Sequence, residues 1–338
     1  MSNLCNSAAY FKEVCGPLFY FDFILLILSF SSPTNYMSQL SAMLGSKAPQ
    51  LALILITLIW GATFITVQYG LNFSSPVLFV GLRFAAATLA VGLISWRSLR
   101  GFSLDELYAG FAIGAVIALG YATQTIGLQS ISSSESAFLT ALYVPLVPLL
   151  LWLCFGQRPH IMTWLGAILA FVGLVFLTGN GLGAIQLNFG QAITLIGSIA
   201  IAFEIILIGY FANRVNLKRV TLIQLGCASL LCFAIAPLVG ETQLPEFQWS
   251  LLAVLLGLGI ASAVIQLVMN WAQRQVDPAQ AAIIYAGEPV WAALIGRLAG
   301  ERLAVVALFG GLLVVLGVLV SEWRPKFLNR NTSSKKVE

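Results

Sequence analysis

Long apolar runs alternate with short polar breaks along the chain from residue 49 to residue 323. Gly, Pro, Asn and charged residues in the breaks divide this region into ten runs. Each run is close to the ~20 residues that a helix needs to cross a bilayer. The pattern therefore predicts an all-α integral membrane protein with ten transmembrane helices. We place these helices at residues 50–71, 75–96, 104–128, 135–155, 160–178, 188–212, 218–239, 249–273, 279–300 and 303–322.

The composition supports this interpretation and excludes a soluble globular domain. Of the 338 residues, 59% are hydrophobic and 9% are charged, whereas soluble domains hold about 45–50% apolar and about 25% charged residues. The formal net charge of +4 does not indicate a nucleic-acid surface, because the charges of the last fifteen positions already account for it. We therefore expect the lipid bilayer, and no nucleic acid, around the protein.

Basic residues are distributed unevenly between the alternate loops. One set of loops and tails carries thirteen Lys and Arg residues, and the other set carries Arg302 alone. Because cytoplasmic loops carry the basic excess, both termini are expected in the cytoplasm, with the chain in the cell (inner) membrane. The thirteen residues are Lys47, Arg97, Arg100, Arg158, Arg214, Lys218, Arg219, Arg274, Arg324, Lys326, Arg330, Lys335 and Lys336.

The two halves of the apolar region resemble each other when the chain is displaced by 144 residues. Gln129–Leu177 then superposes on Gln273–Ser321 with nine identities in 49 positions, among them a proline, an arginine and three glycines. Because each half holds five spans, an odd number, the second half enters the membrane from the opposite side, which gives two inverted five-helix repeats. The predicted domains are an N-terminal extension (1–48), a first five-helix repeat (49–180), a second five-helix repeat (187–322) and a basic cytoplasmic tail (323–338).

The first 48 residues belong to neither repeat. Their apolar segment, Leu18–Phe30, is too short to cross a membrane, is interrupted by Asp22 and lacks a convincing signal-peptide cleavage site. Two alternatives stay open: translation starts at Met37 or Met43, or the segment is poorly ordered or lies at the membrane interface.

The sequence offers almost no enzyme machinery. His160 is the only histidine, no lysine follows a glycine, and none of the three aspartates lies near a membrane centre. These absences exclude a Ser-His or Cys-His pair, a phosphate-binding P-loop and an intramembrane aspartyl dyad. The five cysteines show no C-x-x-C spacing. We expect no catalytic residue, no metal site and no cofactor.

Three ionisable side chains lie deep inside predicted spans: Arg83, Glu204 and Glu288. Such residues are costly to insert, by about 2.5–3.5 kcal/mol, and are therefore candidates for function with a partner to be sought. Glu288 and Arg83 lie at comparable depths near the membrane centre, so they could form a structural pair or line a substrate path. Glu204 could serve in coupling or be a neutral, hydrogen-bonded side chain.

The eighth span carries a polar stripe at steps of four residues: Ser262, Gln266, Asn270 and Arg274. On a helix these residues share one face, which cannot face lipid. The stripe either holds helices together through hydrogen bonds or lines a wet cavity. Other spans could add polar and aromatic residues to such a cavity, namely Trp60, Gln124, Tyr143, Tyr285 and Trp291.

Five short segments follow one another along the chain: Trp60-Gly61-Ala62-Thr63-Phe64, Leu82-Arg83-Phe84, Glu288-Pro289-Val290, Gly300-Glu301-Arg302 and the segment from Gly310 to Gly317. Together, in this order, they resemble the drug/metabolite transporter superfamily, specifically its EamA-type members. The resemblance covers about residues 50–322 and implies a proton- or exchange-driven carrier of small metabolites, often an exporter, with a central cavity between the repeats. The first repeat departs from the second, since Gln157 stands opposite Glu301 and Val144 opposite Glu288.

These observations predict a secondary active transporter of small amino-acid-like or amphipathic solutes that works by alternating access, with export expected. A non-transporting structural or assembly subunit is the alternative, a membrane-embedded enzyme comes third, and a homodimer stays open. Glu288 and Glu204 are the candidates for proton coupling and Arg83 is their candidate charge partner. The predicted substrate pathway consists of Trp60, Gln124, Tyr143, Gln266, Asn270, Tyr285 and Glu288.

Overall fold

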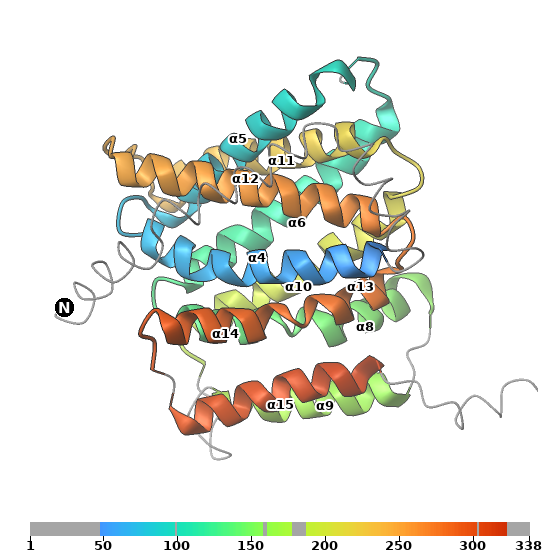
Figure 1. Ribbon diagram of the computed structural model, residues 1–338, viewed down its shortest axis with the longest axis vertical. Coiled ribbons are helices and arrows are strands. Elements are labelled where there is room, and N and C mark those ends of the chain that lie inside the picture. Colours follow the sequence, from blue (N-terminus) through green and yellow to red (C-terminus); the bar gives the residue numbers. More distant parts are fainter. Residues whose placement is uncertain (1–47, 99, 158–160, 178–186, 303, 323–338) are drawn as a thin grey trace, which may run out of the picture.

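The computed structural model describes residues 48–98, 100–157, 161–177, 187–302 and 304–322, which consist of helices and their connecting loops. The predicted N-terminal extension up to residue 47, the loop around Asn180 and the basic tail lie outside the described residues. Figure 1 shows the helices running roughly parallel or antiparallel in stacked layers.

The first repeat contributes six α-helices, because its fourth span is broken in two. They are α4 (Ala48–Gly70), α5 (Pro76–Ser95), α6 (Leu104–Gly127), α7 (Ser133–Thr140), α8 (Tyr143–Phe155) and α9 (Ile161–Leu177), and a short 3-10 turn, η3 (Trp96–Ser98), follows α5.

The second repeat has the same order of elements, and its fourth span is also broken. It consists of α10 (Phe189–Phe211), α11 (Leu217–Ile235), the 3-10 turn η5 (Ala236–Val239), α12 (Trp249–Ala272), α13 (Pro278–Tyr285), α14 (Glu288–Leu298) and α15 (Val305–Glu322).

These elements confirm the predicted all-helical fold with two five-span repeats. Among the described residues, eight segments are long and apolar enough to cross a membrane, with α7 joined to α8 and α13 joined to α14. The remaining pair, α9 and α15, supplies the fifth span of each repeat. When η5 is counted with α11, the observed helix ends lie within two residues of the predicted spans.

The sequence did not predict the breaks within the fourth span of each repeat. Prolines lie just beyond both breaks, at Pro145 and Pro289. A proline lacks the amide hydrogen and disfavours helical geometry in the residue before it. The backbone locally tightens to i→i−3 hydrogen bonds, from Leu142 N to Leu139 O (3.3 Å) and from Gly287 N to Ile284 O (3.2 Å).

The breaks also correct the register between the repeats. Tyr143 and Glu288 each begin the helix that follows the break. Equivalent positions around the breaks are therefore 145 residues apart, not 144. The same displacement relates the N-cap residues Ser132 and Asp277. Tyr143, and not Val144, is therefore the counterpart of Glu288.

Helices of the two repeats interleave around a common core. Within this core α6 packs against α10 and α11, while α4 packs against α12 and α14. Glycines allow the closest approaches: a Cβ at Gly114 would lie 2.6 Å from Gln224 O and 2.7 Å from Cys227 Cβ.

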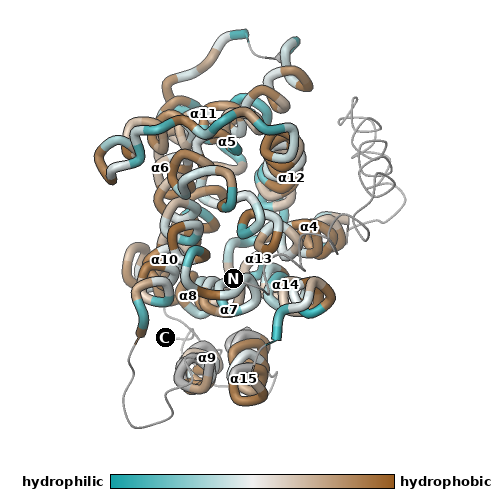
Figure 2. Tube along the Cα trace, turned by 90° about the vertical axis from the view of Figure 1, so that its left-hand side faces the viewer, coloured by the Kyte–Doolittle hydropathy of each residue, from teal (hydrophilic) through white to brown (hydrophobic). Residues whose placement is uncertain are grey.

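Helices α9 and α15 form a separate pair at one side of the bundle (Figures 1 and 2). They contact each other far more extensively than either contacts the remaining helices. A Cβ at Gly173 would lie 2.6 Å from Gly310 O, so their backbones nearly touch. All of the site residues predicted from the sequence lie in the larger group of helices.

Candidate functional site

The residues predicted for the substrate path and for coupling gather in the interior, and each is at most 5% exposed. They come from helices of both repeats, so the site is shared between the repeats. Its members are Trp60 (α4), Arg83 (α5), Gln124 (α6), Tyr143 (α8), Glu204 (α10), Gln266 and Asn270 (α12), Tyr285 (α13) and Glu288 (α14).

Glu288 and Tyr143 meet at the two helix breaks. The Tyr143 hydroxyl donates a hydrogen bond of 3.0 Å to Glu288 Oε2, and both side chains are fully buried. Because each residue begins the second half of a broken span, this bond joins the two repeats at equivalent positions. A movement of either broken helix would change this contact.

A chain of amide side chains leads to Glu204. Asn270 Nδ2 donates to Gln224 Oε1 (3.3 Å), Gln224 Nε2 donates to Gln266 Oε1 (2.7 Å), and Gln266 Nε2 donates to Glu204 Oε1 (2.6 Å). Every donor in the chain points toward Glu204, so the last amide of the chain donates to its carboxyl group. The polar stripe of α12 thus faces the interior, where it binds side chains of α10 and α11.

Arg83 binds to the same stripe. Its Nε donates a hydrogen bond of 2.8 Å to Ser262 Oγ. The guanidinium carbon lies 5.1 Å from the centre of the Tyr121 ring and 5.6 Å from that of Phe84, which places the cation over two aromatic rings. This geometry differs from the expected pair with Glu288, since no salt bridge joins Arg83 to Glu288 in the described part of the chain.

Each of the three buried ionisable groups retains one polar atom without a hydrogen-bond partner among the described residues. These atoms are Arg83 Nη2, Glu204 Oε2 and Glu288 Oε1. Buried polar atoms are nearly always hydrogen-bonded, and leaving one unpaired costs about 1–3 kcal/mol. These three atoms are among the buried side-chain atoms that no described residue satisfies.

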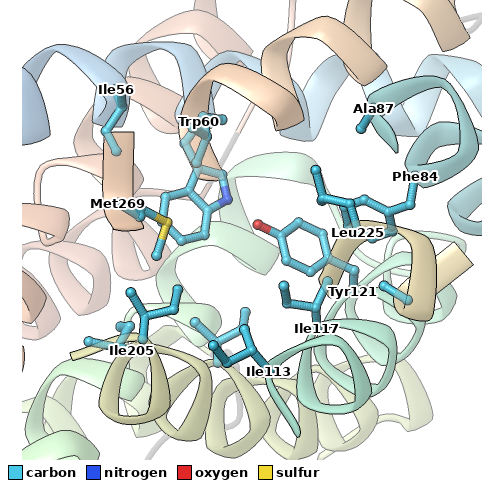
Figure 3. Packing of buried hydrophobic residues seen from close by; sticks show 14 of the residues in the cluster. Ile56, Trp60, Phe84, Ala87, Ile113, Ile117, Tyr121, Ile205, Leu225 and Met269 are labelled. Atoms are coloured by element: carbon cyan, nitrogen blue, oxygen red, sulfur yellow. The ribbon is translucent and has the colours of Figure 1, made fainter. Parts of the chain in front are cut away.

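Aromatic side chains surround the polar groups. Trp60 and Tyr285 form an edge-to-face pair with ring centres 5.7 Å apart, and Gln273 Nε2 donates to the Tyr285 hydroxyl (3.2 Å). In Figure 3 the hydroxyl of Tyr121 points toward the side on which Trp60 and Met269 lie. The rings offer apolar surface beside the charged groups.

Gln124 lies apart from the amide chain. Its Nε2 donates to Thr140 Oγ1 (3.1 Å), at the end of α7 next to the helix break. This hydrogen bond thus joins α6 to the broken span of its own repeat. Within the described residues it connects Gln124 to neither Glu204 nor Glu288.

Sequence reasoning missed Gln224 and Tyr121 as members of the site. Gln224 is fully buried and joins Gln266 to Asn270, and Tyr121 lies beneath the Arg83 guanidinium. Gln224 could have been found, because it is a single amide within the apolar run of the seventh span. Tyr121 gives no such signal, since aromatic residues are common in apolar spans.

No cluster of three or more potential metal ligands occurs in the described ranges. The site therefore consists of three ionisable side chains, a string of amides and a lining of aromatic rings. Such a set can bind a solute and exchange a proton.

Comparison with known proteins agrees with the two-repeat fold. The EamA-like transporter family matches residues 48–179 and, a second time, residues 188–323. An uncharacterized transporter of Archaeoglobus fulgidus is 30% identical over 275 residues, which are 81% of this chain and 85% of the relative. The uncharacterized inner membrane transporter YedA of Escherichia coli K12 is 28% identical over 282 residues, which are 80% of this chain and 89% of YedA.

The fold is also known from a solved structure. One crystal structure of a protein superposes with a TM-score of 0.61 and 19% sequence identity, covering 85% of this chain and 99% of the other. At this identity the likeness shows the fold alone. The two family matches together span nearly all of the described residues. The chain is a multi-pass membrane protein that belongs to the EamA-like transporter family.

Proposed function

We propose that the protein is a secondary carrier of the cell membrane that exports small zwitterionic or amphipathic metabolites by alternating access, coupled to protons or to exchange. The observation that carries this proposal is Glu288. It is fully buried, begins the helix after a break, contacts the other repeat through Tyr143, and keeps one carboxylate oxygen without a partner among the described residues.

The coupling step follows from the cost of a buried charge. A carboxylate near the membrane centre costs about 2.5–3.5 kcal/mol on insertion scales. Glu288 therefore takes up a proton when the site is closed and releases it when the site reaches water. Because Tyr143 holds the other oxygen, the change of charge acts on the contact between the two broken spans.

The free polar atoms favour a solute with two opposite charges. Arg83 Nη2 is suited to a carboxylate, and Glu204 Oε2 is suited to an ammonium group. Their partners, Ser262 and Gln266, lie four residues apart on α12, so both groups contact the same face of that helix. Trp60 and Tyr285 would contact the apolar part of the solute. A single arginine among carboxylates suits a zwitterion better than a phosphate.

The test is the Glu288→Gln variant in reconstituted vesicles. Glutamine keeps the shape and an acceptor for Tyr143 but does not titrate. We expect exchange of substrate across the membrane to persist and accumulation driven by a pH gradient to disappear. One charge moving across about 100 mV carries roughly 2.3 kcal/mol, enough for an approximately 50-fold gradient at about 1.4 kcal/mol per tenfold.

The substrate for this test comes from a thermal-shift screen of zwitterions and phosphates on the purified protein. A ligand at 100 times its dissociation constant adds about 2.7 kcal/mol of stability. If Glu288→Gln still concentrates the substrate under a pH gradient, Glu288 is not the coupling residue and Glu204 takes its place. If the wild-type protein moves no solute at all, the alternative of a structural subunit is favoured.

A further inference from the structure

The two broken spans cross so that each end of the protein has its own pair of half-helices. At one end α7 packs against α14, and at the opposite end α8 packs against α13. We call these the Glu301 end and the Asp277 end, after residues in the adjoining loops. Tyr143 and Glu288 lie between the two ends, at the breaks. In an alternating carrier these two helix pairs would separate in turn.

At the Glu301 end a carboxylate ties the helix pair together. Glu301, in the loop after α14, accepts hydrogen bonds from Ser133 N (2.9 Å), Ser134 N (3.2 Å) and Ser134 Oγ (2.5 Å). Ser133 and Ser134 are the first two residues of α7. The carboxylate therefore binds a helix N-terminus of the other repeat, where the helix dipole strengthens the contact.

The equivalent positions at the Asp277 end lack the carboxylate, the hydroxyl and one of the two backbone amide donors of this contact. Gln157 replaces Glu301, directly after a left-handed glycine in both repeats, and its side chain is exposed. Pro278 replaces Ser133 and has no amide hydrogen to donate, while Ala279 replaces Ser134 and has no hydroxyl. The acceptor and the donors thus differ together between the repeats.

Gly296 provides the space for the Glu301 contact. A Cβ at this position would lie 2.5 Å from Glu301 Oε2 and 2.6 Å from Ser134 Oγ, so any larger residue would displace the bond. Gly296 lies four residues before the left-handed Gly300, and the residue four before the left-handed Gly156 is Trp152. A third coordinated difference therefore separates the two ends.

We propose that Glu301 is a latch that holds the Glu301 end closed, so that the resting carrier favours opening at the Asp277 end. This inference rests on the proposed alternating access. A cavity of about 10 Å³, lined in part by Ser134 and Glu301, adjoins the contact, and this is close to the smallest volume that holds one water.

The test uses two cysteine reporters, introduced one at a time at equivalent positions by Ala137→Cys in α7 and Ala282→Cys in α13. Both alanines are fully buried. The purified full-length protein in detergent is treated with a water-soluble thiol reagent, and the labelling rate of each reporter is followed by peptide mass spectrometry. The buried Cys232 of α11 serves as an internal standard.

Glu301→Gln replaces one acceptor oxygen of the latch with a donor. We expect the α7 reporter to be labelled about tenfold faster, equivalent to about 1.4 kcal/mol, and the α13 reporter to be labelled more slowly. Ser134→Ala removes only the hydroxyl donor and should shift both rates in the same directions by about threefold. Glu246→Gln changes an exposed acidic residue of the loop before α12 and should change neither rate.

Opposite changes at the two reporters are the signature of the latch. Unchanged rates in both variants, or faster labelling of both reporters and Cys232 together, would overturn it, since the latter pattern is general loosening. The labelling needs no substrate. If the labelling rates change as expected but the protein transports no solute, the proposed function is refuted and the latch stands. If the protein transports solute but the labelling rates do not change, the latch is refuted and the proposed function stands.

Discussion

At the scale of single residues, Gln224 joins Asn270 to Gln266 and so to the chain that ends at Glu204. In Gln224→Leu, Asn270 Nδ2 keeps its bond of 2.9 Å to the backbone oxygen of Gln266, but Gln266 Oε1 loses its partner. One orphaned buried acceptor costs about 1–3 kcal/mol. We expect a lower unfolding temperature in detergent and slower transport, because Gln266 no longer holds Glu204 in place.

Ser229→Ala, on the same helix, is the matched control for this prediction. It removes a buried hydrogen bond of 2.9 Å to the backbone oxygen of Gly81, which lies outside the amide chain. We expect a stability loss near ~1 kcal/mol and nearly normal transport. Equal loss of transport in the two variants would mean that the amide chain has no special role.

The identity of most site residues followed from the sequence, whereas their pairing did not. Depth along a span predicts that Arg83, Glu204 and Glu288 lie inside the membrane, because a charged residue in an apolar run has few alternatives. Depth cannot tell which helices are neighbours. Arg83 therefore contacts Ser262 and Tyr121, which lie on helices adjacent to α5, and not the acidic residue at its own depth.

At the scale of helices, the crossing of α4 with α14 depends on Gly61. A Cβ at this position would lie 2.8 Å from Trp291 Cβ and 2.9 Å from both Ala292 N and Glu288 O. Backbone atoms cannot move aside as a flexible side chain does. We expect Gly61→Ala to destabilise the protein by about 1–3 kcal/mol and, by shifting α14, to impair transport through Glu288.

Gly226→Ala is the control for the same substitution in a helix with free space. Its nearest neighbour would be Thr88 Cγ2 at 3.5 Å, an ordinary contact. Because alanine is the better helix former, we expect a gain of about 0.5–1 kcal/mol. Thermal unfolding of the two variants should shift in opposite directions, and a loss of similar size in both would contradict the close crossing.

At the scale of helices, the length of an apolar run predicts a span but not the break within it. Apolar length predicted every span, because the bilayer imposes about 20 residues on each helix. Pro145 and Pro289 lie next to the breaks, but the register of 145 residues around the breaks depends on the three-dimensional path of the backbone. Counting identities selects 144, the displacement that matches Pro145 with Pro289, and thus misses the equivalence of Tyr143 and Glu288.

At the scale of the whole molecule, the distribution of basic residues predicts the orientation in the membrane. Among the described loops, one end of the bundle carries six basic residues and the Glu301 end carries Arg302 alone. Several of the six are tied to the ends of helices: Arg219 forms a salt bridge of 3.2 Å with Glu106, and Arg274 donates to Val215 O (2.9 Å). The six residues are Arg97, Arg100, Arg214, Lys218, Arg219 and Arg274.

We expect reporters inserted at Thr242 and near Asn180 to lie outside the cell and a reporter fused after Glu338 to lie in the cytoplasm. The reason is that positively charged loops are retained on the cytoplasmic side during insertion. Paired reporters, one active only outside and one only inside, would be read at each position in intact cells. Cytoplasmic signals at all three positions would contradict the ten-span topology. A fully reversed pattern would keep the fold but turn the Glu301 latch into a gate on the cytoplasmic side.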